Sequence, residues 1–182
     1  AELQLDDGQY AEALISLNRV RERHPTHTQA LKLLGELHYR RRDWQPLAEL
    51  LPSLRRRGNV PVEMLDEWSV DTYGNIMTSV RLDRAAIDKV WEEIPRHLRR
   101  EPRLTLTRAK ALINCGGIED AEVEIRQTLK EDWSEALIDL YGELALHDTA
   151  AHLKRIEAWL KERPEDPALL LAAGRASVRH QL

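Results

Sequence analysis

The chain has 182 residues, of which 42% are hydrophobic and 32% are charged, and its formal net charge is −4 at pH 7. This composition excludes a disordered chain, and the negative balance gives no reason to expect a nucleic-acid partner. The single Cys115 excludes an internal disulfide, and the longest apolar run, Ala168–Ala173, is far shorter than the ~20 residues of a membrane span.

Amphipathic helices are predicted one after another from the N-terminus. The first is Gly8–Pro25, the next surrounds Gly35 in the stretch Leu31–Trp44, and a third follows at Asp43–Gly58. A glycine inside a helix costs about 1 kcal/mol relative to alanine, so Gly35 needs a packing reason. Arginines cluster at positions 40–42, 55–57 and 99–100, which we interpret as favourable charge near helix C-termini.

The predicted helices and the distance between them are longer in the middle of the chain. We expect a longer helix at Val62–Ser79, a turn around Arg81–Asp83 and a second helix that continues to Arg100. Pro95 falls inside that second helix, where it is expected to kink the helix or to mark a tight contact.

Three further helices are predicted in the C-terminal third of the chain. They are Gly117–Trp133, Thr149–Pro164 and Asp166–Leu182. Asp166 followed by Pro167 is a strong start signal, because an acidic N-cap and a proline at the first helical position both favour a helix N-terminus.

A small residue recurs inside the first helix of each successive pair, at Gly35, Ala109, Gly142 and Gly174. Gly142 and Gly174 are 32 residues apart, and each small residue is followed by a turn and a second amphipathic helix. Helix pairs of this length, with Gly or Ala at close contacts, resemble the tetratricopeptide repeat. We therefore expect an all-α, right-handed α-α superhelical solenoid that forms a single domain over residues 1–182. The expected repeats are 1–27, 28–61, 62–102 (elongated), 103–133, 134–164 and 165–182 (incomplete).

Three stretches together resemble one family. They are "DWQPLAELLPSLRRRG", in which prolines are expected to interrupt the helix at Pro46 and Pro52, "TLTRAKALINCGGIEDAEVEIRQTLK" and "AWLKERPEDPALLLAAGRASVRHQL". They resemble the C-terminal repeat region of the HemY family of protoheme IX biogenesis proteins of proteobacteria. The resemblance implies a bacterial inner-membrane protein linked to late haem synthesis, which organises other proteins and is not a catalyst. It also implies an anchoring segment N-terminal to this chain. We expect the repeats on the cytoplasmic side, where an even number of spans would place them if the N-terminus starts there.

No catalytic constellation is evident in the sequence, and an enzyme is not expected. Cys115 lies in "INCGG" at a helix end, where it is either a small apolar residue packed near a turn or a thiolate ligand for haem iron.

The histidines are interpreted as structural or as loop residues. His38 is expected to be buried between the helices of a repeat, and only one of His147 and His152, which flank a turn, is expected to face the groove. No two histidines have the i, i+4 spacing of a metal site, so no metal ligand is assigned to His24, His27, His38, His97, His147, His152 or His180.

A binding groove is the preferred functional hypothesis. In such solenoids the first helix of each repeat lines the concave face, and the candidate groove residues at these positions are Lys32, Tyr39, Arg40, Arg103, Lys110, Arg175 and Arg179. Cations beside apolar area suit an acidic peptide or porphyrin propionates, and the alternative is an ordinary solvated face. Glu36 stands where a carboxylate-clamp repeat would carry asparagine, which argues against that mode of peptide binding.

Two hypotheses follow. The first is a scaffold that holds late haem-synthesis enzymes or their porphyrin, with protein partners and no cofactor of its own. The second is a protein that itself binds haem or porphyrin, through a histidine, Cys115 or the basic-apolar groove.

The last helix leaves Leu169, Leu170, Ala173 and Val178 without a partner helix, so we also expect self-association through Asp166–Leu182.

Overall fold

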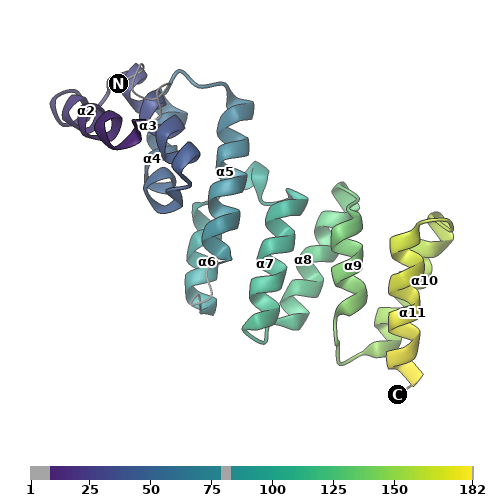
Figure 1. The fold of residues 1–182 in the computed structure, drawn as a ribbon. Coiled ribbons are helices and arrows are strands. Elements are labelled where there is room, and N and C mark those ends of the chain that lie inside the picture. The colour runs from purple at the N-terminus through teal and green to yellow at the C-terminus, as the bar shows by residue number, and fades with distance from the viewer. Residues whose placement is uncertain (1–8, 79–82, 182) are drawn as a thin grey trace. The chain divides into compact units, whose positions relative to one another are not determined.

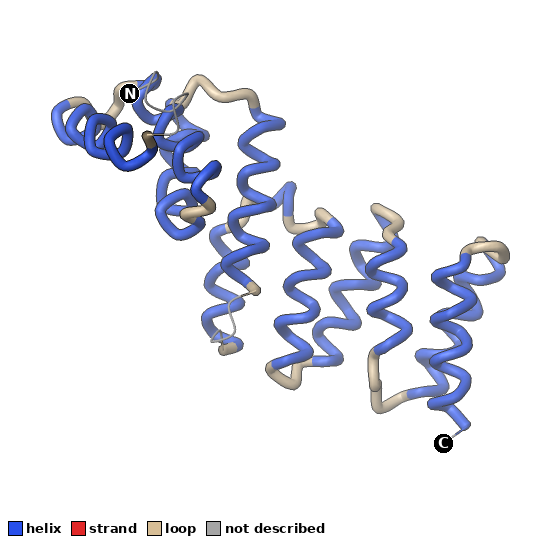
Figure 2. The backbone as a smooth tube through the Cα atoms, in the orientation of Figure 1, coloured by secondary structure: helices blue, strands red, loops and turns tan. Residues whose placement is uncertain are grey.

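The computed structural model describes residues 9–78 and 83–181, and 80% of these residues are helical. Helices joined by loops account for the described part of the chain, which contains no strand (Figure 2). The prediction of an all-α helical repeat fold is confirmed. The chain forms two compact units, Ala1–Ile76 and Met77–Leu182. The continuous right-handed solenoid and the repeat boundaries stay predictions.

The N-terminal unit contains four of the helices labelled in Figure 1: α2 (Tyr10–Arg23), α3 (Thr28–Arg41), α4 (Trp44–Arg57) and α5 (Val62–Met77). Helix α3 packs against both α2 and α4. The core between α3 and α4 is built from leucines, namely Leu31, Leu34, Leu37, Leu47, Leu51 and Leu54. Ser79 and the expected turn at 81–82 lie outside the described residues, as does Gly8.

Helix α4 is continuous, so the prediction that Pro46 and Pro52 interrupt it is wrong. Pro46 is the third helical residue, where a backbone N–H would have no helical partner. Pro52 lies in the helix interior, where it removes one hydrogen bond at a cost of about 3 kcal/mol. Leucines at positions 47, 50, 51 and 54 are all buried, and their burial offsets that loss.

Gly35 lies within α3 at a close contact, as predicted. A Cβ atom at this position would lie 2.8 Å from the Trp68 ring of α5 and 2.9 Å from the Leu54 side chain of α4. The absence of a side chain at Gly35 therefore lets three helices meet at one point, which is the packing reason that the sequence required.

Seven helical elements lie in the described part of the C-terminal unit, residues 83–181. They are α6 (Arg84–Glu93), the 3₁₀ turn η1 (Arg96–Leu98), α7 (Pro102–Asn114), α8 (Ile118–Glu131), α9 (Glu135–Glu143), α10 (Thr149–Glu162) and α11 (Pro167–Gln181). Helix α9 packs against both α7 and α11, so the first helices of successive pairs lie side by side (Figure 1). Helices α8 and α10 pack against α7 and α11, respectively.

Pro95 ends a helix and does not lie inside one, so the predicted kinked helix reaching Arg100 is wrong. Helix α6 ends at Glu93, and Ile94 adopts extended backbone angles of φ −70° and ψ 131°. The ring of a proline excludes the residue before it from the helical region, which accounts for the break. The chain then forms the short turn η1 before α7 begins.

The start of α11 is capped as predicted. The Asp166 carboxylate accepts hydrogen bonds from the backbone N–H groups of Ala168 (2.9 Å) and Leu169 (3.2 Å), and Pro167 is the first helical residue. The indole N–H of Trp133 donates to the other carboxylate oxygen over 3.0 Å. One side chain therefore fixes the N-terminus of α11 and ties it to the loop between α8 and α9.

Gly142 and Gly174 occupy different environments, although the repeat pattern equates them. A Cβ atom on Gly142 would lie 2.6 Å from the backbone Cα of Ala172, so α9 and α11 are in backbone contact there. A Cβ atom on Gly174 would meet nothing within 4 Å, and the predicted close contact at Gly174 is wrong. Ala172, which is fully buried, is the residue of α11 that makes this contact.

A buried arginine joins three helices of the C-terminal unit. Arg108 of α7 is 8% exposed, and its guanidinium lies 4.4 Å from the centre of the Trp91 ring of α6. It also pairs with Asp88 of α6 at 2.9 Å and with Glu124 of α8 at 2.7 Å. Because its charge is compensated from both sides, Arg108 links neighbouring helix pairs without leaving a buried charge unpaired.

The outer face of α11 is only partly as predicted. Leu169 is fully buried, whereas Leu170, Leu171 and Val178 are more than half exposed. Self-association through this helix stays a prediction. No helix among the described residues is long and apolar enough to cross a membrane.

Two glycine-to-alanine variants test the backbone contact between α9 and α11. Gly142→Ala should lower the free energy of unfolding by about 1–3 kcal/mol, because the new methyl group overlaps the α11 backbone. Gly174→Ala, made in the same kind of helix but facing open space, should raise it by up to about 1 kcal/mol through helix propensity. Urea unfolding of both variants measures the difference, and equal effects would contradict this account.

Candidate functional site

An aromatic cluster lies in the N-terminal unit, where α3 ends, α4 begins and α5 passes beside them. The Tyr39 ring of α3 stacks on the Trp68 ring of α5, with centroids 5.5 Å apart and planes at 25°. Trp44, the first residue of α4, meets the same tyrosine edge to face at 6.1 Å. The rings pack because the turn between α3 and α4 is only two residues long, which brings Trp44 back toward the end of α3.

Polar groups of α5 are fixed beside these rings. The Tyr39 hydroxyl donates a hydrogen bond of 2.5 Å to the Asp71 carboxylate. The Asn75 amide donates to the main-chain oxygen of Asp71 over 2.8 Å. The Asp71 carboxylate of α5 is therefore tied to α3 by the Tyr39 hydroxyl.

Two arginines supply positive charge to the same place. Arg40 and Arg42 line a cavity of about 460 Å³ together with Tyr39, Trp44, Asp71 and Asn75. Among residues 9–78, neither guanidinium forms an ion pair with a carboxylate. With one carboxylate and two guanidinium groups, the lining carries a net positive charge. Such a site can accept a carboxylate through paired N–H donors while an adjoining apolar group lies on the rings.

Arg42 occupies a backbone conformation that usually belongs to glycine. It is the C-cap of α3, with φ 58° and ψ 33°, and its N–H donates to the carbonyl groups at the helix end. The left-handed region costs a residue with a side chain about 1–2 kcal/mol, and helices commonly end there with glycine. Arginine at this position keeps a guanidinium at the cavity in spite of that cost.

The predicted groove residues fall into separate groups. Tyr39 and Arg40 share the cavity described above, whereas Lys32 pairs with Glu36 on α3 at 3.9 Å. In the C-terminal unit, Arg103 bonds to Glu101 at 2.9 Å, and Lys110 is exposed on α7.

The two arginines of α11 both bind the preceding helix. Arg175 contacts Asp139 at 2.5 Å and Glu143 at 3.4 Å. Arg179 donates to the carbonyl oxygens of Gly142 (2.8 Å) and Leu144 (2.9 Å), so it caps the C-terminal end of α9. These contacts add a structural role to residues that were proposed as ligand contacts.

Sequence reasoning missed four residues of the cavity, which are Arg42, Trp44, Asp71 and Asn75. The available signal was the run of arginines at 40–42, which the sequence pattern also explains as helix-end charge. Asp71 and Asn75 had none, because their place beside Tyr39 depends on how α5 packs against α3.

The histidines and Cys115 form no cluster. Within the described residues, no group of three or more His, Cys, Asp or Glu side chains is arranged to hold a metal ion. His38 is buried, as predicted, and lies 3.4 Å from Asp43. His152 is buried against the Tyr141 carbonyl oxygen at 2.9 Å, while His147 is exposed. Cys115 is exposed at the end of α7, so the prediction that it packs as an apolar residue is wrong.

Comparison with known proteins adds one structural likeness. No protein-family model matches the chain, and no curated protein matches it. A crystal structure of a thermophilic TPR protein from Thermus thermophilus aligns over 99% of this chain and 95% of its own, with 19% sequence identity and a TM-score of 0.44.

The left-handed conformation of Arg42 yields a stability prediction. Arg42→Gly should raise the free energy of unfolding by about 0.5–1 kcal/mol, because glycine adopts this conformation without strain. Arg41→Gly, one residue earlier and inside α3, should lower it by up to about 1 kcal/mol. Thermal and urea unfolding measure both variants, and a loss of stability in Arg42→Gly would contradict the argument.

The two buried histidines predict destabilisation in mild acid. Burial lowers the pKa of His38 and of His152 below the ordinary value of 6.5. The unfolded chain then binds more protons than the folded chain, so stability is full above about pH 6.5 and is lost as the pH falls through that value. Urea unfolding between pH 7.5 and pH 5 should show this slope, roughly in the range where histidine titrates. The double variant H38Q/H152Q should have a flatter profile, and an unchanged slope would count against these two groups.

Proposed function

We propose that this chain is a non-catalytic scaffold that binds an acidic segment of a partner protein through the cavity of the N-terminal unit. The observation that carries the proposal is the pair of guanidinium groups, Arg40 and Arg42, beside the Tyr39 and Trp44 rings in a cavity of about 460 Å³. Ligand sites of this size commonly combine apolar walls with a few oriented polar groups.

The ligand chemistry follows from the charges of the lining. Asp71 accepts from Tyr39, so it neutralises part of the positive charge but not both guanidinium groups. A glutamate or aspartate side chain would form charge-assisted hydrogen bonds with them, and a neighbouring aromatic or proline residue would lie on Trp44. A protein segment supplies both the carboxylate and the adjoining apolar side chain that these groups suit.

The haem-related function is a finer proposal, which rests on the resemblance to the HemY family. Under it, the partner is a late haem-synthesis enzyme, and the intact protein is anchored in a bacterial inner membrane with its repeats in the cytoplasm. A porphyrin is the second candidate ligand, because two guanidinium groups beside aromatic rings also suit two propionates on a planar ring. Cell fractionation tests the location, and a haem titration followed at the Soret band tests the porphyrin.

Peptide binding tests the main proposal. The probe is a fluorescein-labelled peptide with adjacent glutamates next to a tyrosine, and its control replaces the glutamates by glutamines. Fluorescence anisotropy should give saturable binding of the acidic peptide only. Arg40→Gln and Arg42→Gly should each weaken it by about tenfold, because each removes charge-assisted hydrogen bonds of about 1.5–3 kcal/mol.

Arg57→Gln is the matched control, because Arg57 is an exposed arginine at the end of α4 that does not line the cavity. The Arg42→Gly variant is informative because it is expected to be more stable than the parent chain, so weaker binding cannot come from misfolding. Equal binding by the acidic and the neutral peptide, or an equal loss in Arg57→Gln, would refute the proposed site.

A further inference from the structure

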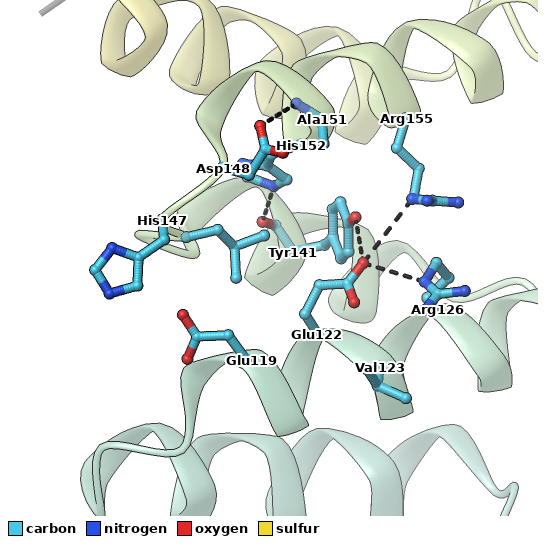
Figure 3. A pocket seen from close by; sticks show the side chains of 11 residues that line it. Glu119, Glu122, Val123, Arg126, Tyr141, His147, Asp148, Ala151, His152 and Arg155 are labelled. Carbon is cyan, nitrogen blue, oxygen red and sulfur yellow. Dashed lines mark hydrogen bonds and ion pairs between the residues drawn. The ribbon is translucent and has the colours of Figure 1, made fainter.

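A second cavity lies in the C-terminal unit, on the side formed by the second helices of the pairs. Its walls come from α8, from Tyr141 of α9, from the loop that joins α9 to α10 and from α10 (Figure 3). Its volume is about 340 Å³, which is enough for a large side chain together with its backbone. None of the groove residues predicted from the sequence lines it.

A nearly buried carboxylate organises this cavity. The Glu122 side chain of α8 is 15% exposed and accepts a hydrogen bond of 2.9 Å from the Tyr141 hydroxyl. Burial and the hydrogen bond to Glu122 raise the pKa of Tyr141, so the phenol keeps its proton and stays a donor at neutral pH. Glu122 is therefore fixed on the core side of the cavity.

Two guanidinium groups are oriented by the same carboxylate. The Nε atom of Arg126 lies 3.1 Å from a Glu122 oxygen, and the Nε atom of Arg155 lies 3.9 Å from that oxygen. Figure 3 shows both groups on one side of Glu122, with Arg155 reaching down from α10 and Arg126 up from α8. Among residues 83–181 neither has another carboxylate partner, so two cations share one anion.

The rest of the cavity is apolar, with an acidic group at the far end. Val123, which is 38% exposed, and Leu146 line it beside the Tyr141 ring. Glu119 lies at the opposite end from the arginines, below the loop that carries His147 (Figure 3). Its carboxylate has no hydrogen-bond or ion-pair partner in the described part of the C-terminal unit.

We infer that this cleft is a second binding site, for a peptide carboxylate that adjoins an apolar side chain and follows a basic residue. The carboxylate bridges the outer N–H groups of Arg126 and Arg155, which are already oriented by Glu122. The apolar side chain lies against Val123 and Leu146, and the basic residue faces Glu119. The carboxylate is that of a peptide C-terminus or of an aspartate or glutamate side chain.

This site selects against the acidic run that suits the N-terminal cavity. Three carboxylates (Glu119, Glu122 and Asp148) and two guanidinium groups line the cleft, so its net charge is −1 with neutral histidines. A single carboxylate is attracted by the two arginines, but every further acidic residue is repelled by Glu119. The two cavities therefore recognise different segments.

Three labelled peptides test the inference by fluorescence anisotropy with the whole chain. The first ends in lysine, alanine and leucine with a free carboxylate, the second is its C-terminal amide, and the third is amidated but carries glutamate before the leucine. The first should bind saturably and the second at least about tenfold more weakly, because it lacks the charged acceptor. Tight binding of the third assigns the site to side-chain carboxylates, and weak binding assigns it to C-termini.

Variants of exposed residues identify the contacts. Arg155→Gln should weaken binding about tenfold, whereas Lys154→Gln, the adjacent exposed residue outside the cleft, should change it less than about twofold. Glu119→Gln should remove the preference for lysine over glutamine in the peptide. Arg42→Gly should leave this binding unchanged, which separates it from the N-terminal cavity. No saturable binding of any peptide at about 1 mM, or equal losses in Arg155→Gln and Lys154→Gln, would overturn the inference.

Discussion

The close approach of helices at residues without side chains determines how each unit is built. At Gly142 the α9 and α11 backbones touch, since even a methyl group would lie 2.6 Å from Ala172. At Gly35 the lack of a side chain likewise lets α3 contact the Leu54 and Trp68 side chains. Because protein interiors are packed as densely as organic crystals, such contacts fix both the distance and the rotation of one helix against the next. The cavity at Tyr39 exists because α5 is held at that distance from α3.

Arginines also hold neighbouring helices together, because their side chains are long enough to reach from one helix to the next. Arg108 joins α7 to α6 and α8, while Arg179 reaches from α11 to the carbonyl end of α9. An arginine that donates to the backbone of the next helix uses its N–H groups to stabilise the fold, whichever helix face it occupies. The cations of the two candidate sites are instead Arg40 and Arg42 in one unit, and the pair oriented by Glu122 in the other.

The fold was largely predictable from the sequence, whereas the candidate sites were not. Helix periodicity, the Asp166 cap and the recurring small residues are local signals, and they predicted the helices and the contact at Gly142. Gly174 has the same local signal, but its surroundings depend on what packs beside it. Likewise, Arg42 contributes to a cavity through an unusual backbone conformation, and Asp71 reaches Tyr39 from 32 positions away. Neither property is present in a short stretch of sequence.

The bonds between successive helix pairs have a consequence for the kinetics of folding. They join residues that are close along the chain: Tyr39 and Asp71 are 32 positions apart, Arg84 and Asp120 are 36, and Arg179 and Gly142 are 37. Closing loops of this size costs less entropy than closing a loop between the two ends of the chain, and proteins rich in local contacts fold in microseconds to milliseconds. Within each unit, a chain emerging from the ribosome can thus form these bonds once about 40 further residues have been synthesised.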